Sequence, residues 1–119
     1  MIALLIFLLA APQVTAIGAG TGVESRTLVG VASRFPANGA PVFVHATLTN
    51  AEAEQGITWV WLKDGQERWR KAQSVGTSEG WRTWTRMVMP PENAGTWTVE
   101  VRAADDTVLH AVVFIVARP

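Results

Sequence analysis

The stretch GWRTWTRMVMPPENAGTWTVEV, residues 80–101, holds two runs of alternating side chains separated by a proline pair. In the second run Trp97, Val99 and Val101 alternate with polar residues. Successive side chains of a β-strand point to opposite faces, so this run predicts a strand with one buried apolar face. The prolines at 90–91 cannot donate ladder hydrogen bonds and therefore separate this strand from the preceding one. The stretch thus predicts two strands of an all-β domain.

The same pattern continues on both sides of this stretch. Short runs rich in β-forming residues are separated by turn signals about every ten residues, which is typical of a β-sandwich. Asp64-Gly65 is the clearest of these signals, because glycine accepts a positive φ without steric cost. We expect strands at 27–34, 41–49, 57–63, 67–75, 81–89, 96–103 and 108–116. The sequence therefore predicts a seven-stranded antiparallel β-sandwich, with at most one helical turn at 50–56.

The period of two also predicts which side chains form the core. Large apolar residues that alternate with polar ones are assigned to the buried face. The expected core residues are Trp61, Trp81, Trp97, Val99, Val101, Phe43 and Val113.

An apolar segment at residues 2–11 precedes the predicted strands. Its length of about ten residues is too short to cross a bilayer, which needs about twenty. Small side chains at Ala16 and two positions before it fit a signal-peptidase site, with cleavage before Ile17. The sequence predicts a signal peptide at 1–16; a retained membrane anchor and a buried core helix are the alternatives.

This interpretation divides the chain into three parts. A signal peptide at 1–16 is followed by a Gly-rich flexible linker at 17–26 and a β-sandwich domain at 27–119. The expected location is periplasmic or secreted. Membrane contact is expected only through the signal segment, if that segment is retained.

Composition excludes several classes of function. The chain has 119 residues, enough for one domain, and its 10 Lys and Arg balance its 10 Asp and Glu. This balance gives no support for binding nucleic acid. The chain contains no cysteine, which excludes disulfides, thiolate catalysis and zinc sites built on cysteine.

No residue pattern indicates catalysis, a metal or a cofactor. None of the serines lies in a Gly-x-Ser-x-Gly motif, and no pair of carboxylates is expected to share a cleft. His45 and His110 both lie within apolar runs. We expect them to be partly buried and hydrogen-bonded, because a metal site normally needs three or four protein ligands. The chain is predicted not to be an enzyme.

The strongest candidate site is a cluster of tryptophans and arginines. It consists of Arg68, Trp69, Arg70, Arg82, Trp84 and Arg86. Three interpretations remain open. The cluster could be structural, with Arg82 and Arg86 stacked around Trp84. It could bind an envelope protein, since tryptophan and arginine are favoured at interaction hot spots. It could also bind a glycan such as peptidoglycan on flat indole faces.

The stretches WLKDG at 61–65, WRTWT at 81–85, AGTWTVEV at 94–101 and VLHAVVFIV at 108–116 resemble the bacterial family described as domain of unknown function 2914. The resemblance covers roughly residues 40–116. It implies an envelope-associated β-sandwich, and the AGTWTVEV strand is also similar to those of immunoglobulin and fibronectin-type sandwiches. It implies no activity. The expected function is therefore a non-catalytic envelope module for protein interaction or structural support, with glycan binding as the alternative.

Overall fold

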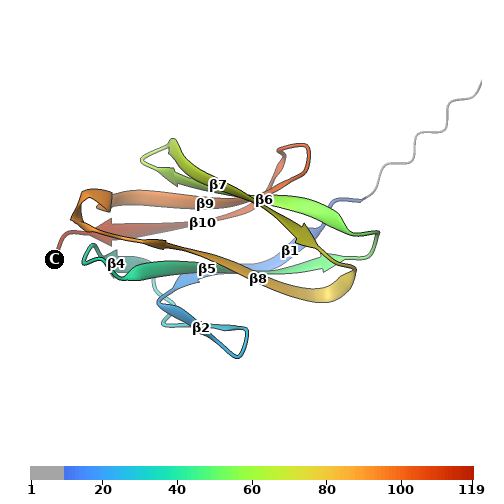
Figure 1. The fold of residues 1–119 in the computed structure, drawn as a ribbon, viewed down its shortest axis with the longest axis horizontal. Coiled ribbons are helices and arrows are strands. Elements are labelled where there is room, and N and C mark those ends of the chain that lie inside the picture. The colour runs from blue at the N-terminus through green and yellow to red at the C-terminus, as the bar shows by residue number, and fades with distance from the viewer. Residues whose placement is uncertain (1–9) are drawn as a thin grey trace, which may run out of the picture.

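The computed structural model describes residues 10–119, which form β-strands and one short 3₁₀ helix (Figure 1). Residues 1–9 of the predicted signal peptide lie outside this part of the chain. The strands are β1 (Gln13–Gly20), β2 (Gly22–Glu24), β3 (Thr27–Val29), β4 (Arg34–Pro36), β5 (Pro41–Asn50), β6 (Gln55–Lys63), β7 (Gln66–Val75), β8 (Ser78–Val88), β9 (Gly95–Ala103) and β10 (Val108–Ala117), and the helix is η1 (Pro91–Asn93). The all-β prediction is confirmed.

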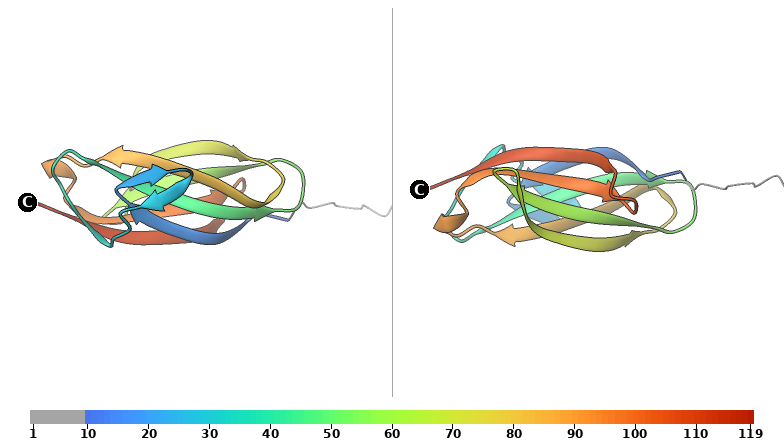
Figure 2. Two further views of the ribbon diagram at one scale, coloured as in Figure 1. Left: turned by 90° about the horizontal axis from the view of Figure 1, so that it is seen from below. Right: turned by 90° about the horizontal axis from the view of Figure 1, so that it is seen from above.

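The strands form two larger sheets and a hairpin. One sheet has the order β1-β5-β8, the other has the order β4-β10-β9-β6-β7, and β2 pairs with β3. Figures 1 and 2 show the larger sheets as two facing layers, with the β2–β3 hairpin on the outer side of the three-stranded sheet. Every strand pair is antiparallel except β4 with β10. In residues 10–119 no helix is long and apolar enough to span a membrane.

The first predicted strand, 27–34, is divided in the structure. The chain leaves β3 at Gly30, whose φ of 65° is left-handed and ends the extended conformation. It then returns as β4, parallel to β10, where the Ile115 amide donates to the Ser33 carbonyl at 2.9 Å. The sequence predicts seven antiparallel strands. The structure instead has ten strands in residues 10–119, and one pair of them is parallel. Residues 50–56 form no helix, because β5 ends at Asn50 and β6 begins at Gln55.

The segment predicted to be a flexible linker, residues 17–26, is part of the folded structure. Residues 17–20 complete β1, which pairs with β5, and residues 22–24 form β2. The glycines of this segment make room for Leu28, since a Cβ added at Gly18 or Gly20 would lie 3.1 or 2.9 Å from a Leu28 methyl carbon. Glycine here indicates close packing of the hairpin against β1.

The core lies between the two larger sheets. Trp61, Trp97, Val99 and Val101 are fully buried, as predicted, and the Trp61 ring meets Trp97 edge-on at 6.1 Å between centroids. Trp81 is only partly buried but packs against this core. Four of the predicted core residues are therefore confirmed.

The prediction was wrong for Phe43 and Val113. Val113 is 58% exposed, because β10 pairs so that Phe114, opposite Trp97, faces the core instead. Phe43 lies opposite Arg86 on the outer face of β5, whereas Val42 and Val44 on either side of it are buried. In β10 apolar side chains occupy both faces, so alternation alone does not identify the buried face. In β5 alternation does identify it, because Phe43 shares its face with His45 and Thr47, and the prediction overlooked this.

Candidate functional site

β7 and β8 lie at one side of the molecule. Each is the outermost strand of its sheet, so one edge of its backbone is not paired within the sheet. The side chain of Gln73 connects them: it accepts a hydrogen bond from Trp59 Nε1 at 3.0 Å and donates one to the hydroxyl of Thr83. The two edge strands therefore border the same opening between the sheets.

Two tryptophans from different sheets meet at this opening. Trp69 of β7 pairs with buried Trp61, so it lies on the core-facing side of its sheet, at the edge, and is 38% exposed. Trp84 of β8 lies on the outer face of the other sheet and is 37% exposed. Both line one open groove of about 430 Å³. The other lining residues are Phe43, Lys71, Thr85 and Arg86. We call these six residues the indole groove.

Arg68 adds positive charge beside the indole groove. It lies at an irregularity in the β6–β7 pairing and lines an adjoining depression of about 360 Å³ with Trp69, Arg86 and Met87. Within residues 10–119, none of Arg68, Lys71 and Arg86 forms a salt bridge. The groove therefore combines exposed aromatic faces with three cations that have no carboxylate partner in this part of the chain.

The predicted stacking of arginines on Trp84 is not found. The Arg86 guanidinium lies over the Phe43 ring instead, 6.0 Å from its centroid. The ring that stacks on Trp84 is the imidazole of His45, with centroids 5.9 Å apart and planes 4° apart. Alternation places the Trp84 indole on the outer face directly opposite His45, which explains the pairing.

Arg70 belongs to a different surface. It lies opposite Val60 on the outer face of the five-stranded sheet, where it contacts Glu67 at 2.7 Å and Asp106 at 3.3 Å. Hydrogen bonds from the Arg70 guanidinium lower the pKa of Glu67 below its usual value of 4.5. Arg102 extends the network through Asp106 at 3.1 Å. These side chains cover Val60, which is fully buried although it faces outward.

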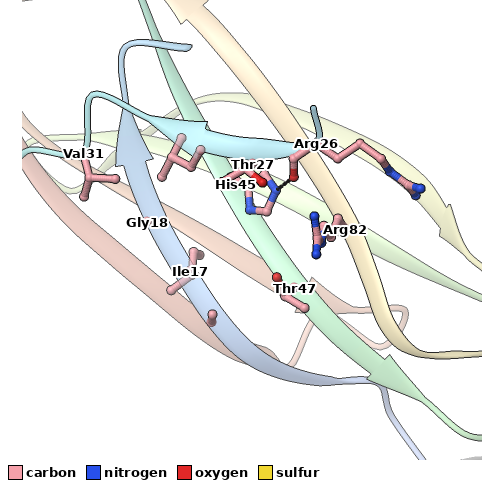
Figure 3. Close-up of a pocket in the computed structure, with 10 residues that line it drawn as sticks. Ile17, Gly18, Arg26, Thr27, Val31, His45, Thr47 and Arg82 are labelled. Atoms are coloured by element: carbon pink, nitrogen blue, oxygen red, sulfur yellow. Dashed lines mark hydrogen bonds between the residues drawn. The ribbon is translucent and has the colours of Figure 1, made fainter. Parts of the chain in front are cut away.

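Arg82 also lies apart from the indole groove. It lines a second pocket of about 410 Å³, formed where the β2–β3 hairpin covers β1 and β5 (Figure 3). We call this the hairpin pocket. Its lining residues are Ala16, Ile17, Gly18, Arg26, Thr27, Leu28, Val31, His45, Thr47 and Arg82. The predicted six-residue cluster is thus divided: Arg68, Trp69, Trp84 and Arg86 are brought together, whereas Arg70 and Arg82 are not.

His45 connects the β2–β3 hairpin to the three-stranded sheet through a hydrogen bond. Its Nε2–H donates to the carbonyl of Arg26 at 2.8 Å, and the residue is 9% exposed. The prediction of a partly buried, hydrogen-bonded imidazole is confirmed for His45. For His110 the predicted burial is wrong, because the residue is exposed on β10, although its Nδ1 accepts a hydrogen bond from the Ala111 amide at 2.8 Å.

Sequence reasoning missed the hairpin residues Arg26, Thr27 and Leu28. Their signal was present in VESRTL, a two-residue turn between β-forming residues, but its turn positions hold serine and arginine instead of the usual glycine or asparagine. A glycine-rich segment next to it favoured the linker interpretation.

These observations define an all-β protein of two facing sheets with two surface hollows that share the Trp84–His45 pair at their boundary. Residues 54–116 match the family model described as "Protein of unknown function (DUF2914)", so the chain belongs to this family. The resemblance seen in the sequence is confirmed. The matched segment contains β6 to β9 and most of β10, and therefore most of the indole groove. The chain matches no curated protein.

Proposed function

We propose that the chain is a non-catalytic interaction module that binds a protein partner through the indole groove. The observation that carries this proposal is the meeting of Trp69 and Trp84, from two different sheets, in one groove with Lys71 and Arg86. Exposed tryptophan and arginine side chains supply large contact area and charge at interaction hot spots. Both indoles also contact aromatic rings of their own protein, Trp69 with Trp61 at 6.3 Å between centroids and Trp84 with His45, yet each keeps more than a third of its surface exposed.

The charge of the groove indicates the chemistry of the partner. Arg68, Lys71 and Arg86 have no carboxylate partner within residues 10–119, although the chain as a whole has a formal net charge of zero. An acidic segment would satisfy these three cations. The unpaired edges of β7 and β8 would let an extended segment add main-chain hydrogen bonds.

We place this module in the bacterial envelope, either periplasmic or secreted. The apolar segment at 2–11, followed by small side chains at a predicted cleavage site before Ile17, supports export. We also assign the two facing sheets to the immunoglobulin and fibronectin-like class of sandwiches. The three- and five-stranded sheets, packed face to face around Trp61 and Trp97, support this assignment.

A photocrosslinking amino acid at position 84 tests the proposal in cells. We expect a specific crosslinked product that is lost when Lys71→Glu and Arg86→Glu are added, because the cations contact the partner. The matched control places the same crosslinker at Val113, which is 58% exposed on the outer face of the other sheet. A product obtained equally from positions 84 and 113, or one insensitive to charge reversal, contradicts the proposal.

Glycan binding is the second candidate, and one observation favours it. Thr85, 5% exposed, lines the groove, and its buried Oγ1 has no hydrogen-bond partner within residues 10–119. The groove thus combines an unpartnered polar group with two aromatic side chains, a combination that suits a sugar ring. Titration with muropeptides, followed by tryptophan fluorescence, distinguishes the candidates. A saturable change that Trp84→Ala abolishes supports the glycan, and no change supports the protein partner.

A further inference from the structure

We propose that the hairpin pocket binds a small amphiphilic anion, with a carboxylate or phosphate head group and a short apolar tail. This site is separate from the indole groove, so the proposal stands or fails independently of the proposed function.

The pocket presents two guanidinium groups from different elements. Arg26 comes from the turn of the β2–β3 hairpin and Arg82 from β8. Neither forms a salt bridge within residues 10–119, where the ion pairs involve only Arg70 and Arg102 as cations. Two arginines without a carboxylate partner in this part of the chain leave net positive charge at one pocket of about 410 Å³, which favours an anionic ligand. Guanidinium groups bind carboxylate and phosphate oxygens with paired hydrogen bonds.

Hydroxyl groups and an apolar end complete the pocket. The lining includes Thr27 and Thr47, which can donate to an oxyanion. Figure 3 shows Arg26 and Arg82 toward one end and Val31 and Ile17 toward the other. A ligand with a charged head and a short hydrocarbon tail matches this division better than a bare inorganic ion does.

The backbone around Arg26 is held in place before any ligand binds. Ser25 and Arg26 have φ values of 49° and 64°, a left-handed conformation that a large side chain rarely adopts. The His45 Nε2–H bond to the Arg26 carbonyl and the seating of Leu28 against Gly18 stabilise this turn. Strain of this kind persists where the surroundings fix it, and it is common at ligand sites. The turn therefore presents Arg26 at the rim of the pocket at little further backbone entropic cost on binding.

The test is a titration of the full-length protein, followed by ¹H–¹⁵N NMR. The probes are hexanoate, hexyl phosphate, inorganic phosphate and neutral hexanol. We expect hexanoate or hexyl phosphate to shift the amides of Thr27, Leu28 and Thr47 in a saturable way, and the tighter of the two identifies the head group. Inorganic phosphate should bind more weakly because it lacks the tail, and hexanol because it lacks the charge.

Variants distinguish specific binding in the hairpin pocket from general electrostatic attraction to the protein. Arg82→Gln should weaken binding by at least about tenfold, the usual effect of losing a charge-assisted hydrogen bond. Arg34→Gln removes an exposed arginine of β4 outside the pocket and should leave affinity within about twofold, because salt screens distant charges. Arg26→Gln provides a second variant if Arg82→Gln changes the fold. Equal binding of hexanol and hexanoate, equal loss in Arg34→Gln, or shifts confined to the indole groove would overturn the proposal.

Discussion

His45 and Trp84 lie directly opposite each other on β5 and β8, and their rings stack with planes 4° apart and centroids at 5.9 Å. Trp84 lines the indole groove and His45 lines the hairpin pocket. One stacked pair thus forms the boundary between the two hollows on this side of the protein.

Replacing Trp84 should therefore affect stability only modestly. Trp84→Ala removes the stacked pair, worth about 0.5–1.5 kcal/mol beyond the area that the partly exposed indole buries. We expect the melting temperature, measured by circular dichroism, to fall by a few degrees. Trp84→Phe, which keeps an aromatic ring over His45, should recover most of the loss. A loss of unfolding free energy as large as that expected for a core tryptophan, about 3–5 kcal/mol, would show that the main role of Trp84 is to pack the protein.

Gly20 should be intolerant of a side chain. A Cβ there would lie 2.9 Å from Leu28 Cδ1 and also too close to the Val29 carbonyl oxygen. Gly20→Ala should destabilise the protein by about 1–3 kcal/mol, the usual cost of overpacking. Hydrogen exchange should also accelerate at the β2–β3 amides.

Gly56→Ala is the matched control, since nothing lies within 4 Å of a Cβ at that position. Unfolding free energies from urea titration compare the two variants. Equal stability of both would contradict the packing of the hairpin on β1.

The start of the mature chain should affect stability, because β1 begins at Gln13, four residues before the predicted cleavage point. Val14 and Ala16 pair with Leu48 and Thr47 of β5. A chain that starts at Ile17 loses these ladder bonds and should be less stable than one that starts at Ala10, by on the order of 2 kcal/mol. Thermal melting of the two chains measures the difference. Identical melting temperatures would mean that the first half of β1 contributes nothing.

Acid should weaken the ion network on the outer face through Glu67. The pKa of Glu67 is lowered in the folded state by hydrogen bonds from Arg70. Its stabilising effect is therefore fully present above the unfolded value of 4.5 and is lost as pH falls through the lower folded pKa. Glu67→Gln should reduce the loss of stability on acidification below about pH 4.5.

Glu79→Gln is the control, because Glu79 is exposed and forms no salt bridge within residues 10–119. Urea unfolding at several pH values gives the comparison. If both variants have the same pH dependence of the unfolding free energy as the parent protein, Glu67 does not stabilise the fold through this ion network.

Much of the strand pattern could be predicted from the sequence, because apolar and polar side chains alternate along several strands. β9 is the clearest case: Trp97, Val99 and Val101 are buried, and Thr98 and Glu100 between them face outward. The same rule failed in β10, where both faces are apolar. Only pairing with β9 places Phe114 inside and Val113 outside, and pairing is a tertiary property.

The candidate site could be predicted only in part, for a related reason. Neighbouring positions on a strand face opposite ways, so Trp69 and Arg70, adjacent in sequence, belong to different surfaces. Trp69 and Trp84 meet because β7 and β8 end their respective sheets at the same side. The hairpin pocket was missed because its glycines resemble those of a linker, and only the position of Leu28 reveals their packing role.

The central claim is that the indole groove binds a partner and is not merely packing. The most direct measurement is crosslinking from position 84, combined with thermal melting, for the variant Lys71→Glu/Arg86→Glu. Both side chains are exposed at the edge strands, so their reversal should leave the melting temperature within a few degrees. We predict that the crosslinked product disappears while the fold persists. A product that survives charge reversal in a fully folded protein would contradict the account.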